Sequence, residues 1–299
     1  MRNTTYNEEK RKPISPSAVA RIVIWSVVLV LLLGVFSAAM LAEHSGFSIL
    51  RIFWDGWDYD DDQFNVGNGA VRTPIHELSI DWVAGNVTVG VTDGEEILIT
   101  EDYDGEKQAY RMRWQVEDGE LAVKCARPSN FGMDIVSKNL EVLIPESMLN
   151  SLEEIHVSTV SAAQDIRVSA RELDVETVSG SVTISGEYTS VEAETVSGDL
   201  HFEGSTKECS FDGVSARAEI RLKEPANLVD METVSGYLKL ILPNHITGFK
   251  VTSNNLSGNT EIHGFDVDGG KSSSWGDESM RIRMDGVSGK LIIEKETID

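Results

Sequence analysis

The sequence has few positively charged residues. Of its 299 residues only 26 are Lys or Arg, against 49 Asp or Glu, and the formal net charge is −23. Residues 1–21 carry +3, from five basic and two acidic residues, so the remainder carries −26. A chain this acidic lacks the positive patch that a nucleic-acid phosphate backbone requires. Nucleic acid is therefore not an expected partner.

Motifs of catalysis and cofactor binding are absent as well. The chain has no phosphate-binding G-x-x-x-x-G-K-[ST] loop, no nucleophile elbow G-x-S-x-G and no H-E-x-x-H. Its six histidines are scattered without metal-ligand spacing: His44, His76, His156, His201, His245 and His263. We therefore expect no catalytic residue, no cofactor and no metal.

One long hydrophobic run is present. Residues 22–42, IVIWSVVLVLLLGVFSAAMLA, contain no charge, and about 20 apolar residues suffice for a helix to cross a bilayer. A cleavable signal peptide is the alternative, because small residues follow at Ser37 to Ala39. Basic residues before the run and acidic residues after it place the N-terminus in the cytoplasm and the C-terminal domain outside the membrane. The expected localisation is thus the cell membrane, with one span.

Residues 43–74 are interpreted as a juxtamembrane linker. Their aromatic residues are typical of the headgroup region, so we expect an interfacial segment followed by a flexible stalk. Four aspartates could suggest calcium, but an EF-hand loop starting at Asp58 would need Gly and Glu where Gln63 and Gly69 stand. We interpret the aspartates as a solvated acidic run.

A short repeat occupies the C-terminal half. Taking the hydrophobic residue before each Ser-Gly or Ser-Ala pair as position 0, the markers are Val160, Val178, Val196, Val214, Val234, Leu256 and Val287. Their spacing of 18 to 31 residues is typical of a solenoid. Position +1 is always Ser and +2 always Gly or Ala. We assign a structural bend to Ser161, Ser179, Gly180, Ser197, Gly198, Ser215, Ser235, Gly236, Ser257, Gly258, Ser288 and Gly289.

Apolar and polar residues alternate on both sides of the marker, and this pattern predicts the bend. Apolar residues recur at −3, as in Val175, and at +4 and +6, as in Val182 and Ile184. Odd and even positions of one strand point to opposite faces, so these residues share a core only if the chain bends near the marker. Each coil then has two short strands, and like residues stack on like. We also expect hydrogen-bonded ladders of Thr and Ser along the stack.

The repeat predicts an all-β fold in which a single-pass N-terminal transmembrane helix precedes a β-solenoid ectodomain with coils of about 18–20 residues. The expected domains are a cytoplasmic tail (1–21), the helix (22–42), the linker (43–74) and the solenoid (75–299). Within the solenoid, residues 75–150 supply N-terminal cap strands and a short helix from Pro145, and residues 151–299 the repeats. VAGNVTV from Val83 faintly resembles the repeat. The insertion from Gly264 to Met280 has loop composition and is the expected place for a specific function.

Two features leave alternatives open. Cys125 and Cys209 would both be exported, where a disulfide is permitted, but their separation in sequence does not decide whether they pair. A polysaccharide-cleaving β-helix would need acidic and basic side chains on one outer face. Glu176, Glu194 and Glu232 are expected in one outward column, and Arg167 and Lys239 in another, which we interpret as solvated faces.

The TVSG-type repeats, the preceding NLEVLIP and the later LKLILP resemble a bacterial family of membrane-anchored β-strand-repeat proteins of unknown function, labelled adhesins. The resemblance covers residues 75–294. It implies a β-solenoid ectodomain and, in several relatives, a role in cell-envelope stress; it brings no catalytic residues. We therefore expect a non-catalytic, adhesin-like surface protein that binds a cell-wall glycan or a membrane protein. The alternative is an accessory or sensor component of an envelope stress-response complex.

Overall fold

The computed structural model describes residues 61–126, 136–267 and 269–297. Within these ranges, no helix is long and apolar enough to span a membrane. The predicted tail and span, residues 1–42, lie outside them.

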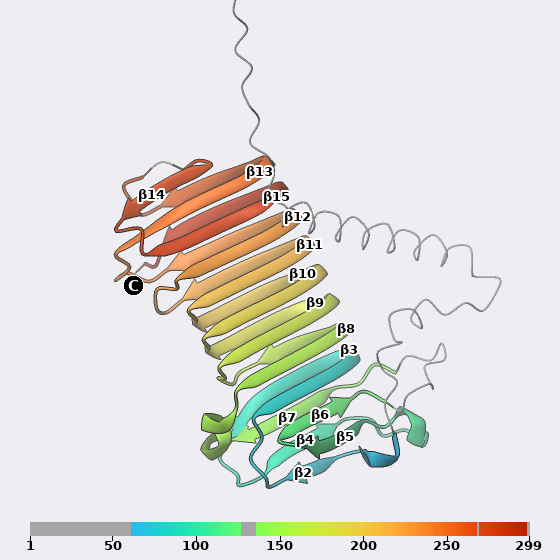
Figure 1. Ribbon diagram of the computed structural model, residues 1–299. Coiled ribbons are helices and arrows are strands. Elements are labelled where there is room, and N and C mark those ends of the chain that lie inside the picture. Colours follow the sequence, from blue (N-terminus) through green and yellow to red (C-terminus); the bar gives the residue numbers. More distant parts are fainter. Residues whose placement is uncertain (1–60, 127–135, 268, 298–299) are drawn as a thin grey trace, which may run out of the picture. The chain divides into compact units, whose positions relative to one another are not determined.

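Eight long, bent strands form the body, and each is one rung of a parallel stack (Figure 1). Neighbouring rungs pair with like residues side by side: Thr195 stands beside Thr177 on one side and Gly213 on the other. The fold is therefore mostly β, with one long, largely parallel sheet. The rungs are β3 (Glu77–Thr92), β8 (Glu154–Ile166), β9 (Glu172–Glu187), β10 (Ser190–Ser205), β11 (Glu208–Leu222), β12 (Leu228–Leu242), β13 (Gly248–His263) and β15 (Met280–Lys295).

The predicted bend lies at the marker. Pairing runs through Thr195, skips Val196 and resumes at Ser197. From β8 to β12, position −1 is buried, positions 0 and +1 face outward, and position +2 turns inward again. Two consecutive outward side chains reverse the phase of the alternation, so each rung contributes to two walls. We call positions −6 to −1 the first wall and positions +1 to +7 the second wall.

The core lies between the two walls and is built from columns of like residues. Positions −3 and +4 are buried in every rung from β8 onward, and +6 in all but β13, which confirms the predicted alternation on both sides of the bend. In β10 these are Ala193, Leu200 and Phe202. Burying a large aliphatic or aromatic side chain contributes roughly 1.5–3 kcal/mol, so the stack gains stability with every rung.

Little space remains inside the bend. A Cβ added to Gly198 would lie 2.4 Å from the carbonyl oxygen of Gly180 in the neighbouring rung and 2.9 Å from Oγ1 of Thr195 in its own. Real Cβ atoms do not approach backbone oxygen this closely. The close approach of two rungs, rather than an unusual backbone angle, therefore requires a small residue here.

Rung β11 fills the same space in a different way. It has Gly213 at −1, where neighbouring rungs have Thr195 and Thr233, and Ala216 at +2, where they have Gly. A Cβ added to Gly213 would lie 2.6 Å from Cβ of Ala216. In β11 the methyl of Ala216 therefore occupies the space that a threonine side chain at −1 would need.

The first rung, β3, extends into an N-terminal cap. Its first half pairs with β6 (Glu120–Lys124), which leads to β5 (Arg113–Glu117) and β1 (Asn65–Val66). Its second half pairs with β7 (Leu140–Pro145), which leads to β4 (Ile97–Glu101) and β2 (Gly69–Val71). Each wall thus continues into its own short sheet. The predicted cap strands and the weak repeat at Val83 are confirmed.

A buried lysine joins the cap to the first rung. Lys138 is 3% exposed and donates to the carboxylate of Glu101 and to the carbonyls of Tyr110 and Cys125. Its ammonium also lies 4.8 Å from the ring centroid of Trp82. Removing one partner of such a pair would leave an uncompensated buried charge, so the junction depends on all of them.

The predicted linker is partly wrong. Residues 65–71, expected in a flexible stalk, form β1 and β2 within the cap. Asp61, at the start of a 3-10 turn (Asp61–Gln63), accepts a hydrogen bond from Nε of Arg113 at 2.6 Å, which contradicts a purely solvated run at that position. Two further 3-10 turns, Gln108–Tyr110 and Glu146–Ser151, complete the cap; the second stands where a short helix was expected.

The order of the last rungs differs from simple stacking of each coil on the one before. In space the order is β12, β15, β13, so the C-terminal rung lies between two earlier ones (Figure 1). The chain passes from β12 to β13, turns back through β14 (Ser272–Gly276), which pairs antiparallel with β13, and then enters the gap. The period of the repeat could not reveal this order, because every rung has the same bend and could stack on any other.

The two cysteines are free and buried. Cys125 lies just after β6 in the cap and Cys209 in β11, four rungs away from β3 in the stack order. Burial raises the pKa of the Cys125 thiol to about 11 and that of Cys209 to about 12. The open question of a disulfide is thus resolved in favour of two thiols.

Exchange of volume at the bend can be tested with a double-mutant cycle. We expect Gly213→Thr to destabilise the protein by about 1–3 kcal/mol, because its side chain meets the methyl of Ala216. In an Ala216→Gly background the same change should cost clearly less, because the space is then free. Urea unfolding of the four proteins measures the coupling, and equal effects in both backgrounds would contradict the packing argument.

Candidate functional site

A groove runs across four rungs beside the bend. It has a volume of about 570 Å³ and is formed by positions +1, +2 and +3 of β10, β11 and β12 and by positions +2 and +3 of β9. Its floor consists of small residues, because the bend admits nothing larger, and the +3 side chains form one border. We call it the corner groove; its residues are Gly180, Ser181, Ser197, Gly198, Asp199, Ser215, Ala216, Arg217, Ser235, Gly236 and Tyr237.

The border of the corner groove changes chemistry from rung to rung. Asp199, Arg217 and Tyr237 are in-register neighbours at position +3. The Arg217 guanidinium lies 5.7 Å from the Tyr237 ring centroid, a cation–π distance. A negative group, a positive group and an aromatic ring thus stand in a row above a floor of hydroxyls and backbone, a combination suited to an extended polar ligand.

The predicted bend residues all stand at the corner, and from Ser179 onward they are in register from rung to rung, whereas Ser161 pairs with Ala84 of β3. The serines at +1 face outward, and among the described residues no hydrogen bond joins one of them to the next. The inward threonines do pair at one step, where Thr159 Oγ1 donates to Thr177 Oγ1 at 3.0 Å. The predicted hydroxyl ladder is therefore wrong for serine and limited for threonine.

The insertion from Gly264 to Met280, expected to carry a specific function, closes the end of the stack. Phe265 and Trp275 lie edge-on to each other at 4.9 Å, and both contact the buried ring of Phe249 in β13. The insertion also supplies β14, which covers the edge of β13. An uncovered edge would invite pairing with another chain, so the insertion has a structural task.

The outer face of the first wall is strongly acidic. Position −2 carries a carboxylate in five consecutive rungs: Glu176, Glu194, Asp212, Glu232 and Asp285. Side chains in adjacent rungs are about 4.8 Å apart along the stack, so these like charges are direct neighbours. The predicted shared column of Glu176, Glu194 and Glu232 is confirmed. The predicted shared column of Arg167 and Lys239 is wrong. Lys239 is at position +5, beside Glu219 of the neighbouring rung, whereas Arg167 is at position +7, directly after Ile166.

Titration of this wall reflects the crowded charge. Burial raises the pKa of Glu194 above its ordinary value of 4.5, and the nearby carboxylates of Glu176, Glu192 and Asp174 raise it further. The hydrogen bond to Asp174 raises the pKa of His156 above its ordinary 6.5, against the opposing effect of burial. The first wall therefore favours bound protons or other cations.

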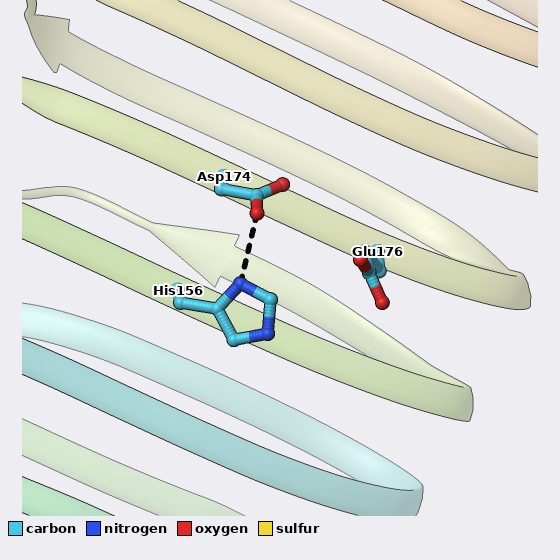
Figure 2. Close-up of side chains that lie close together, drawn as sticks. All are labelled: His156, Asp174 and Glu176. Atoms are coloured by element: carbon cyan, nitrogen blue, oxygen red, sulfur yellow. Dashed lines mark hydrogen bonds and ion pairs between the residues drawn. The ribbon is translucent and has the colours of Figure 1, made fainter.

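One cluster on the first wall was missed by sequence reasoning. His156 of β8 lies beside Asp174 and Glu176 of β9 (Figure 2). His156 and Asp174 are 18 residues apart, one full repeat, so no motif of local spacing could reveal them. The register of the rungs does reveal them, because position −4 of one rung adjoins position −4 of the next.

Comparisons with known proteins identify the repeat region. Residues 163–282 match the family model described as toastrack DUF4097. This segment is therefore similar to that family. The matched residues cover the end of β8, β9 to β14 and the start of β15, and they include the whole corner groove. Comparison with curated proteins gives no match.

Similar solved structures come from bacteria. One is a candidate cell adhesion protein from Clostridium sporogenes, 10% identical, covering 78% of this chain and 100% of its own, with a TM-score of 0.31. A candidate adhesin from Bacteroides fragilis is 13% identical over 78% and 97%, with a TM-score of 0.40. A candidate lipid-binding protein from Parabacteroides distasonis is 14% identical over the same shares, with a TM-score of 0.39. Similarities this distant carry no argument about ligands.

The acidic column makes a prediction about pH. Folding raises the pKa of Glu194, so the protonated form of this side chain stabilises the folded state. This contribution to stability is fully present below the ordinary pKa of 4.5 and is lost as the pH rises through the pKa of the folded state. We expect Glu194→Gln to stabilise the protein at pH 7 by about 0.5 kcal/mol, as for one like-charge neighbour removed, and to have no such effect near pH 4. Urea unfolding at both pH values measures this.

Asp199→Asn is the matched control, because Asp199 is exposed on the second wall. An equal stabilisation by Glu194→Gln at pH 4 and pH 7 would show that charge is not the cause.

Proposed function

We propose that this protein is a non-catalytic, adhesin-like protein of the bacterial cell surface, anchored by residues 22–42, whose acidic solenoid binds an extended polymer outside the cell. The corner groove is the observation that carries the proposal. It offers the same three positions of the repeat in β10, β11 and β12 and two of them in β9, so a polymer lying along the stack meets a regular series of hydroxyls and backbone groups.

Charge narrows the class of ligand. The chain after residue 21 carries −26, and a polyanion would be repelled over the whole surface. A neutral or amine-bearing glycan of the cell wall avoids this repulsion. Tyr237 provides an aromatic face, Asp199 can accept hydrogen bonds from hydroxyl and amide groups, and Arg217 can donate hydrogen bonds to them.

The stiffness of the solenoid also supports a binding role. Both walls are parallel sheets with a filled core, and both ends are covered, by the cap and by β14. A groove on such a scaffold does not have to be ordered when a ligand binds, so little binding energy is lost to ordering. Anchoring would keep this preformed surface on the outer side of the membrane, where cell-wall polymer is found.

Binding can be measured with the full-length chain purified in detergent. Isolated cell-wall polymer should retain it saturably, and the double variant Arg217→Ala/Tyr237→Ala should bind at least about ten-fold more weakly, which corresponds to ~1.4 kcal/mol. Arg281→Ala is the control, because Arg281 is an exposed arginine on the first wall.

Retention that is equal for the groove variant and the wild type would reject the groove as the binding site. If solubilised membrane proteins are captured instead and wall polymer is not, the chain acts as an accessory or sensor in an envelope complex, and the adhesin-like function is rejected.

A further inference from the structure

Three potential metal ligands meet on the first wall, away from the corner groove. Nδ1 of His156 and Oδ2 of Asp174 are 3.0 Å apart. One ligand atom from each of His156, Asp174 and Glu176 lies within 4.8 Å of the other two. Figure 2 shows the imidazole of His156 hydrogen-bonded to Asp174, with the Glu176 side chain to one side of this pair. None of the three side chains is buried, so an ion could enter from solvent.

A simple ion pair accounts for only two of these residues. Glu176 has Ser158 Oγ at 3.5 Å as its hydrogen-bond donor, and no Lys or Arg of the described ranges lies within ion-pair distance of it. Glu194 stands beside Glu176 in the next rung and adds a further carboxylate. Negative charge therefore exceeds positive charge at this point, and a bound cation would compensate it.

The mixed ligand set indicates which cation fits. Carboxylate oxygen alone suits Ca²⁺ and Mg²⁺, whereas imidazole nitrogen suits Zn²⁺ and related transition metals. Ligands at about 2.0–2.1 Å from a tetrahedral ion are roughly 3.3 Å from one another. The ligand atoms lie within 4.8 Å of one another, and rotation of these exposed or half-exposed side chains would bring them to that spacing. Three protein ligands leave one position for water.

We propose that His156, Asp174 and Glu176 bind one divalent transition-metal ion, of which Zn²⁺ fits best, across the rungs β8 and β9. The ion links two rungs next to the cap and neutralises one end of the acidic column. This site is independent of the proposed function, since it lies on the first wall and the corner groove on the second.

The test is calorimetric titration of Zn²⁺ into the chelator-stripped, full-length chain in detergent. We expect one saturable site per chain, with affinity reduced at least about 10-fold in His156→Asn and in Glu176→Gln. Two controls should bind as the wild type does. His245→Asn removes another histidine paired with a carboxylate, Glu224 at 2.9 Å, but without a third ligand. Glu232→Gln removes the same charge from the same column, three rungs away from Glu176.

Unfolding of each variant in chelator shows whether it is folded, so that loss of binding is not confused with loss of structure. Absence of saturable Zn²⁺ binding would overturn the proposal, as would equal affinity in His156→Asn and wild type. Equal binding of Ca²⁺ and Zn²⁺, insensitive to His156→Asn, would also overturn it, because it would show non-specific attraction by the acidic wall.

Discussion

The close approach of successive rungs at the bend is the constraint on which the rest of the structure depends. Two consecutive residues face outward there, and the alternation reverses, so a single strand can supply two walls of one core. The reversal is possible only if position +2 stays small, since the neighbouring carbonyl leaves no space for a larger group. The corner groove is a direct result: small residues at the bend leave a trough beside the larger +3 side chains.

Much of this could be predicted from sequence because the information is local. Period, alternation and the phase change at the marker are visible within 18 residues, and they identified the buried columns, the bend and the cap strands. What depends on pairing between distant segments could not be predicted in the same way. Residues 65–71 resemble a linker, yet they add β1 and β2 to the two cap sheets. Likewise His156 acquires Asp174 and Glu176 only through the register of two rungs.

The insertion of β15 between β12 and β13 has a physical reason in the composition of the two strands. β15 places Met284, Leu291 and Ile293 in the core, whereas β13 places Ser253, Asn255 and Thr260 there. An inner rung is covered on both sides and gains most from apolar side chains. The end rung, β13, has a full rung on its inner side only, and its outer side is covered by β14 and the rings of the insertion. Polar groups are therefore less costly in it. The more apolar rung therefore occupies the inner place, although it comes last in the chain.

The bend also separates the chemistry of the two walls. Positions before it carry the column of carboxylates, and positions after it alternate among acidic, basic and aromatic groups. Because the backbone ladder and the core fix each rung, like charges can be held side by side on the first wall at a modest cost in stability. A cation bound there lowers that cost without changing the corner groove, since no residue is shared between the two sites. The same repeat can thus support a charged, ion-binding wall and a polar ligand-binding groove, and side chains of one can change without disturbing the other.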